Sequence, residues 1–143
     1  MRRNAGFTLM ELLVVILIIT ILSTVVGVQL AGRTGDARCA TVKAQLGNFR
    51  LALKAYALDN SCYPTQEQGL QALVEPSTIA PVPRKFPKEG YLERRTLPLD
   101  PWGHDYVYLI PGSNGESFEV ISYGRDGEPG GEGEDADIST AQQ

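Results

Sequence analysis

The amino-acid sequence predicts an α+β fold in which one long N-terminal helix packs on a small antiparallel β-sheet. An aliphatic stretch from residue 12 to about residue 28 is followed by a second segment whose apolar residues recur at helical spacing. Two short β-rich runs, 106–110 and 118–122, flank a turn sequence. The 143 residues leave room for one modest domain besides the aliphatic stretch.

The chain begins with a short basic leader, residues 1–6, of sequence MRRNAG. An ordinary secretory signal has its small-residue cleavage site after the apolar core, whereas here Gly6 precedes that core. Cleavage after Gly6 would therefore keep the apolar helix in the mature protein. Residues 7–30 are about long enough to cross a bilayer, and Arg2 and Arg3 favour a cytoplasmic amino end. We expect a single-pass transmembrane helix over 7–30, with membrane lipid as a partner.

Glu11 lies inside this apolar helix. A carboxylate there costs about 2.5–3.5 kcal/mol on insertion scales, so it is a candidate functional group that needs a partner. Once the leader is removed, the new α-amino group of Phe7 lies four residues away on the same helical face. The α-amino group of a neighbouring subunit is a second partner. The alternative interpretation places Glu11 at the headgroup boundary beside Arg2 and Arg3.

Residues 36–59 are predicted to form an amphipathic helix. Its apolar positions follow one another at steps of three and four and share one face: Cys39, Val42, Leu46, Phe49, Leu53 and Tyr56. Cys39 is expected to act as a small buried apolar residue. The helix separates Cys39 from Cys62 by far more than the roughly 7 Å that a disulfide allows. No intrachain disulfide is expected, whereas Cys62, in a loop, could pair between subunits.

The remainder of the chain divides into short elements. Thr65 and Gln68 form a capping-box pattern that predicts a short helix over 66–75, ended by Pro76. Prolines at 76, 81, 83 and 87 predict an irregular loop. The sequence from Asp100 to Gly103 predicts a tight turn. Residues 106–122 predict a β-hairpin that packing on the long helix would stabilise.

The negative charge of the chain is concentrated at its carboxyl end. Residues 123–143 hold six acidic residues and one basic residue, while the first 122 residues are close to neutral. Carboxylates on a glycine-rich backbone favour calcium over zinc, which prefers nitrogen and sulfur ligands. Asp135 and Glu132 are expected ligands from their spacing. The alternative is a disordered acidic tail, and a nucleic-acid partner is not expected because no basic face is apparent.

An enzyme is not expected. His104 is the only histidine and lies in a turn beside Asp105, and neither a nucleophile motif nor a phosphate loop is present. A membrane-tethered calcium adhesin would account for the anchor and the acidic loop, but it would leave Gly6, Phe7 and Glu11 unexplained. A structural subunit accounts for all of these features.

The segment Gly6-Phe7-Thr8-Leu9-Met10-Glu11 resembles the prepilin processing motif of type IV pilins and pseudopilins. In those proteins a dedicated prepilin peptidase cuts after the glycine and methylates the new terminal phenylalanine. The resemblance implies cleavage after Gly6, N-methylation of Phe7 and a role for Glu11 in subunit docking.

Other segments resemble the major pseudopilins of type II secretion systems, in order over nearly the whole chain. They are Tyr63-Pro64, QGLQAL at 68–73, GYL at 90–92, LDPWG at 99–103, YGRDG at 123–127 and ADI at 136–138. The resemblance implies an inner-membrane protein whose domain 31–143 is periplasmic. It also implies a homopolymer, the pseudopilus, that drives export of folded proteins across the outer membrane. Minor pseudopilins and an inner-membrane assembly platform are the other implied partners.

The same resemblance implies one structural calcium ion in the loop 123–138, bound by Asp126, Asp137 and the backbone carbonyl of Tyr123. Relatives often carry proline where Val28 stands, and their helix can loosen near it in filaments. Without that proline, Gly27 is the position where this helix could loosen. The alternative family member is a type IV pilin for motility, adhesion or DNA uptake. Such pilins commonly close a C-terminal loop with a disulfide, and no cysteine follows Cys62.

Overall fold

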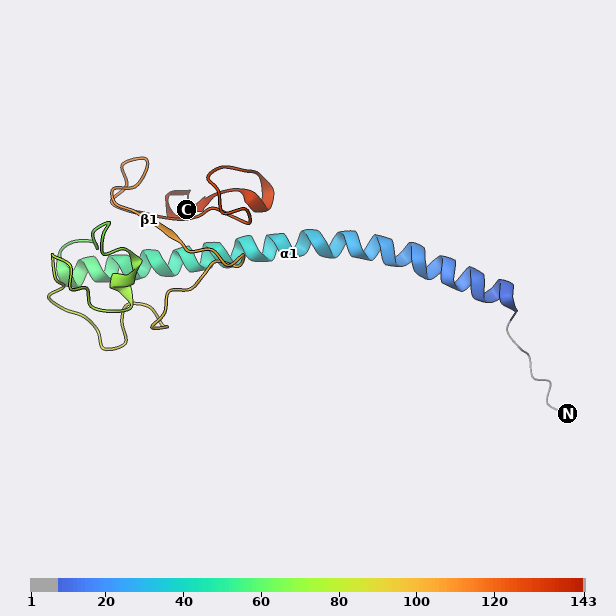
Figure 1. Cartoon of the computed structure of the whole chain (residues 1–143), viewed down its shortest axis with the longest axis horizontal. Coiled ribbons are helices and arrows are strands. Elements are labelled where there is room, and N and C mark those ends of the chain that lie inside the picture. The colour runs from blue at the N-terminus through green and yellow to red at the C-terminus, as the bar shows by residue number, and fades with distance from the viewer. Residues whose placement is uncertain (1–7, 143) are drawn as a thin grey trace. The chain divides into compact units, whose positions relative to one another are not determined.

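A computed structural model describes residues 8–142, with the side chains of 24–33 left outside the description. The chain separates into two compact units, Met1–Ala37 and Arg38–Gln143, which we describe one at a time. The elements in chain order are helix α1 (Leu9–Asn60), 3-10 helix η1 (Leu70–Leu73), strands β1 (Val107–Leu109) and β2 (Glu119–Ser122), 3-10 helix η2 (Gly133–Asp135), strand β3 (Ile138–Ser139) and 3-10 helix η3 (Thr140–Gln142) (Figure 1).

The first unit consists of the start of α1. Thr8 caps this helix, because its Oγ1 accepts a hydrogen bond of 3.2 Å from the backbone N–H of Glu11. The aliphatic side chains that follow are about half exposed or more, from Leu9 at 77% to Leu22 at 59%. Within residues 8–142 no helix is both long and apolar enough to cross a membrane. The transmembrane helix over 7–30 stays a prediction, since Phe7 and the side chains of residues 24–30 lie outside the described residues.

The second unit is built on the C-terminal part of α1. The apolar stripe expected over 36–59 is confirmed: Val42, Leu46 and Leu53 are fully buried, as are Phe49 and Tyr56 to within 1%. Burial of each such side chain contributes about 1.5–3 kcal/mol. Cys39 is partly buried and packs against this core, as predicted. The helix ends at Asn60, after which Ser61 adopts a left-handed backbone conformation with φ of 64°.

The predicted short helix over 66–75 is confirmed only over Leu70–Leu73, where it is a 3-10 helix, and its capping box forms. Thr65 N–H donates to Gln68 Oε1 at 2.9 Å, and Gln68 N–H donates to Thr65 Oγ1 at 3.2 Å. Gly69 has φ of +58°, which an α-helix cannot contain, so residues 66–69 form turns and only Leu70–Leu73 are helical, as a 3-10 helix. Both leucines of η1 are buried against the core.

The predicted hairpin over 106–122 is confirmed and gains a third strand. The sheet is antiparallel in the order β1-β2-β3, with Val107 opposite Ile121 and Ser122 opposite Ile138. Its buried side chains share one core with α1: Tyr108, Val120 and Ile138. In Figure 1 the orange and red segments that carry the sheet lie along one side of this part of α1. The fold class predicted from the sequence is therefore confirmed.

A polar junction attaches the long loop after η1 to the C-terminal end of α1. The buried Asn60 donates through Nδ2 to the backbone oxygens of Tyr56 and Lys85, each at 3.1 Å, and accepts from the Lys85 N–H at 3.0 Å. Lys85 Nζ pairs with Asp59 at 2.8 Å, and the hydroxyl of Tyr91 donates to the same carboxylate. Burial and then the bond to Asp59 raise the pKa of Tyr91 to about 12.

Candidate functional site

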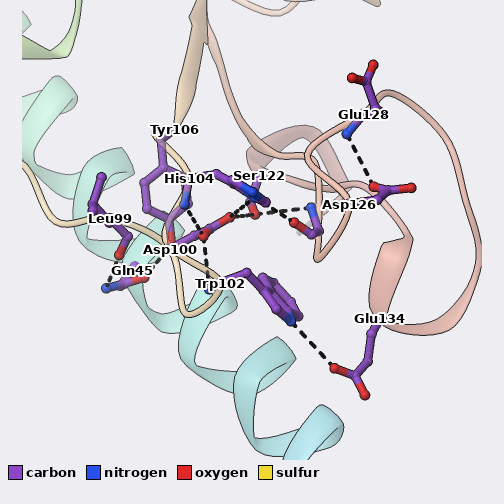
Figure 2. A network of polar contacts seen from close by, with 11 residues as sticks. Gln45, Leu99, Asp100, Trp102, His104, Tyr106, Ser122, Asp126, Glu128 and Glu134 are labelled. Carbon is purple, nitrogen blue, oxygen red and sulfur yellow. Dashed lines mark hydrogen bonds and ion pairs between the residues drawn. The ribbon is translucent and has the colours of Figure 1, made fainter.

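The site is centred on the turn at residues 100–104 and the acidic loop 123–138 that lies against it (Figure 2). Asp100 is buried, and its Oδ1 accepts hydrogen bonds from the N–H groups of Trp102 at 3.0 Å and His104 at 2.8 Å. The Gly103 N–H donates to the Asp100 carbonyl at 3.0 Å, which confirms the predicted tight turn. Oδ2 accepts from the Ser122 hydroxyl at 2.8 Å. One carboxylate therefore shapes the turn and joins it to β2.

His104 connects this turn to the acidic loop. Its Nδ1 lies 3.1 Å from the carbonyl oxygen of Gly124, and a Cβ at Gly127 would come within 3.1 Å of its ring. Trp102 makes a second link, from Nε1 to a carboxylate oxygen of Glu134 at 3.5 Å. His104 had no predicted role. Its only signal in the sequence was its place at the end of the Asp100 turn, which does not reveal a partner twenty residues away.

The two sides of the acidic loop are joined at its base, which we call the neck, where Arg125 contacts both Glu134 and Asp135. The Arg125 N–H donates to the Glu134 carbonyl at 2.9 Å, and the Arg125 guanidinium forms two bonds of 2.8 Å with the Asp135 carboxylate. Gly124 has φ of +71°, and a Cβ there would lie 2.7 Å from the same carbonyl oxygen of Glu134. The neck therefore requires glycine at position 124.

The far part of the loop is closed by Asp137 and Asp126. The Gly130 N–H lies 3.0 Å from both carboxylate oxygens of Asp137. The Glu128 N–H donates to Asp126 Oδ1 at 3.2 Å. These contacts hold the backbone of the acidic loop in a defined conformation. The structure therefore does not show the disordered tail that was the alternative.

The predicted calcium ligands all belong to this loop, but their carboxylates are not gathered. Asp135 pairs with Arg125, Asp126 and Asp137 each bind a backbone N–H, and Glu132 is exposed. Over the described part of the chain, no three side chains from histidine, cysteine and the acids are placed together as a metal site. The donor chemistry nevertheless suits calcium, which takes six to eight hard oxygens. Two carboxylates supply at most four of these, so the rest would have to come from backbone carbonyls, side-chain oxygens of other residues or water.

The N-terminal candidate residues are only partly described. Gly6, Phe7 and the leader arginines lie outside the described residues. Glu11 lies in the first turn of α1 and is exposed. Among the side chains that the structure describes, no cation comes within ion-pair distance of its carboxylate. The hypothesis that Gly27 loosens the helix also concerns residues whose side chains are not described.

Both cysteines are free thiols, with Cys39 half-buried and Cys62 exposed. Cys62 is thus accessible in the single chain. Whether it pairs between subunits stays a prediction.

Comparison with known proteins gives two family matches that together cover nearly the whole chain. Residues 29–141 match the family described as type II secretion system (T2SS), protein G. Residues 1–27 match the prokaryotic N-terminal methylation motif.

Several relatives share the description type II secretion system core protein G. That of Vibrio cholerae serotype O1 is 46% identical over 138 residues, which cover 96% of this chain and 92% of the relative. That of Pseudomonas aeruginosa is 44% identical over 137 residues, covering 96% and 94%.

A solved structure has the same architecture. It is the crystal structure of the major pseudopilin from the type 2 secretion system of enterohaemorrhagic Escherichia coli. The superposition has a TM-score of 0.67 at 40% sequence identity, and it covers 80% of this chain and 95% of that chain.

Proposed function

The chain belongs to the type II secretion system protein G family, and from this we propose that it polymerises into a periplasmic pseudopilus that drives export of folded proteins across the outer membrane. As a member of this family it is a structural pseudopilin subunit of the secretion system and not an enzyme. The observation that carries the proposal is the coincidence, on one chain, of the methylation motif over 1–27 and the protein G domain over 29–141.

The exposed aliphatic face of α1 supports polymerisation. From Leu9 to Leu22 the chain presents an almost unbroken series of half-exposed aliphatic side chains. An apolar surface of this size is not stable in water and needs a membrane or other apolar helices around it. We propose that the inner membrane stores the subunit, with its amino end in the cytoplasm, and that helices of neighbouring copies replace the lipid in the filament.

Processing would create the docking group. We propose that prepilin peptidase cleaves after Gly6 and that the new terminus at Phe7 is N-methylated, as the match to the methylation motif supports. The α-amino group of Phe7 then carries a positive charge close to the depth of Glu11. In the filament, Glu11 would pair with that group on a neighbouring subunit, which removes the cost of an unpaired carboxylate among apolar helices. Minor pseudopilins and the inner-membrane assembly platform are the further partners that we propose.

A structural calcium ion is a separate proposal for the acidic loop. We propose that Asp126 and Asp137 bind it together with the backbone carbonyl of Tyr123, when calcium is present. The support is the all-oxygen donor set and the glycine-rich backbone, which can turn its carbonyls toward one point. Asp135 is committed to Arg125 and therefore serves the neck of the loop, while the exposed Glu132 is a candidate for an additional ligand. The ion would offset part of the repulsion among the six acids of the segment 126–137.

Deletion of the gene in its host tests the proposed function. We expect folded exported proteins to accumulate in the periplasm and secretion to return when the full-length chain is supplied. Normal secretion in the deletion strain, combined with loss of surface motility or DNA uptake, would instead favour the alternative of a type IV pilin.

A further inference from the structure

Two segments of opposite charge lie at the two ends of the second unit. The acidic segment, residues 126–137, contains six acidic residues and no basic one. The basic segment, residues 84–95, contains five basic residues and two acidic ones. Each segment is mostly exposed.

Contacts with α1 fix where each segment lies. Glu134 of the acidic segment is 3.6 Å from Arg38, near the beginning of this unit. Lys85 of the basic segment pairs with Asp59 at 2.8 Å, one residue before the helix ends. Arg38 and Asp59 are 21 positions apart in the helix, so the two ends are roughly 32 Å apart along α1 at 1.5 Å per residue. Figure 1 shows the same arrangement, with the red loop beside the start of this part of α1 and the yellow segment around its end.

Most of the charges in the two segments are not neutralised within the subunit. In the acidic segment, Glu134 and Asp135 have ion-pair partners, whereas Glu128 and Glu132 have none among the described residues. In the basic segment, Lys85 is paired, and three exposed arginines and one lysine make no ion pair with any residue of the described chain: Arg84, Lys88, Arg94 and Arg95. Even with one bound divalent cation the acidic segment would keep a net charge of the opposite sign to the basic one.

We propose that the acidic segment of one copy docks on the basic segment of another copy of this chain. The two surfaces are different and lie at opposite ends of one unit, so the contact is head-to-tail and can repeat from copy to copy, as a filament requires. The same charges oppose a reversed subunit, because that arrangement would bring two acidic or two basic ends together. The contact therefore gives the filament a single direction. This inference rests on the proposed polymerisation and names the surfaces that it uses.

Charge reversal in the full-length chain tests the contact. One variant carries Glu128→Lys and Glu132→Lys, and a second carries Arg84→Glu and Lys88→Glu. Each alone should lower the yield of filaments sheared from cells by about fivefold or more, since the substituted residues would then meet residues of the same charge at every contact. Expressed together, the two variants present complementary ends to each other, and alternating filaments should form at a yield close to that of the unmodified chain.

The controls separate this inference from the function on which it rests. Lys43→Glu and Glu67→Lys reverse one exposed charge of each sign outside the two segments and should leave the yield unchanged. Thermal unfolding of each variant in detergent should match that of the unmodified chain. If the unmodified chain forms no filaments, the proposed function fails. If it does and the reversed variants assemble equally well, or if co-expression restores nothing, the docking contact is wrong.

Discussion

The buried carboxylate of Asp100 accepts a hydrogen bond of 2.8 Å from the hydroxyl of Ser122, which joins the 100–104 turn to strand β2. The other oxygen of this carboxylate binds two N–H groups of the turn, so every oxygen of the buried group is used. The 100–104 turn also contacts the acidic loop, through His104 and Trp102. The loop is thus positioned by a residue that is itself buried in the second unit.

Ser122→Ala should destabilise the second unit by about 1–3 kcal/mol, because it leaves a buried charged oxygen without its donor. Chemical denaturation of the full-length chain in detergent measures the change in the free energy of unfolding. Thr96→Ala, which removes an exposed hydroxyl, is the matched control and should change the free energy by less than about 0.5 kcal/mol. Equal effects of the two substitutions would contradict the role assigned to Asp100.

Gly124→Ala should destabilise the acidic loop far more than Gly115→Ala. Both glycines have positive φ, 71° and 88°, but nothing lies within 4 Å of a Cβ at Gly115, whereas one at Gly124 would lie 2.7 Å from a carbonyl oxygen. The backbone cost of about 1–2 kcal/mol is common to both, and the clash adds about 1–3 kcal/mol at Gly124. The midpoint of thermal unfolding should therefore be lower for Gly124→Ala than for Gly115→Ala. The reverse order would contradict the close approach of Gly124 to the Glu134 carbonyl.

Alkaline pH should weaken the junction at the end of α1. Burial and the bond to Asp59 raise the pKa of Tyr91 from 10 to about 12. Between those two values the unfolded chain binds fewer protons at this group than the folded chain, so the free energy of unfolding must fall as pH rises. Tyr91→Phe should make the fall between about pH 10 and 12 less steep. An unchanged slope in denaturation experiments across this range would contradict the contribution of Tyr91.

Removal of calcium should lower the thermal stability of the acidic loop. The midpoint of unfolding, measured in excess calcium and in chelator, should differ for the unmodified chain and coincide for Asp126→Asn and Asp137→Asn. Asp135→Asn should lower stability in both conditions yet keep the calcium dependence, because Asp135 holds Arg125. Glu67→Gln, an exposed acid outside the loop, is the control. Identical unfolding midpoints of the unmodified chain in calcium and in chelator would contradict the calcium proposal.

Glu11→Ala should leave membrane insertion intact and lower filament yield by about tenfold or more, in line with the cost of an unpaired charged group in the bilayer. Membrane fractionation and electron microscopy of sheared filaments measure the two properties separately. Normal filaments from this variant would remove Glu11 from the docking mechanism.

The sequence was informative where its patterns are local and periodic. The stripe from Val42 to Tyr56 predicted the amphipathic helix, because steps of three and four residues place side chains on one helical face. The hairpin was predicted because β-rich runs flank a turn. The helix expected at 66–75 formed only over Leu70–Leu73, because a capping box shows only where a turn starts and Gly69 then adopts φ of +58°.

The site was less predictable, because its contacts join distant residues. The six acids near the carboxyl end were evident, but the pairing of Arg125 with Asp135 and the contact of His104 with Gly124 depend on tertiary structure. Strand β3 has only two residues, too few for alternation to be recognised. Thr8 as the helix cap was missed although Thr8 and Glu11 have the spacing of a capping box.

The mass of the mature protein purified from its host tests the central claim most directly. A prepilin-type subunit is expected to have the mass of residues 7–143 plus one methyl group, and fragmentation should place that methyl on the amino group of Phe7. A mature protein that keeps residues 1–6, or one cleaved after the aliphatic stretch, would contradict assembly through a retained, processed N-terminal helix.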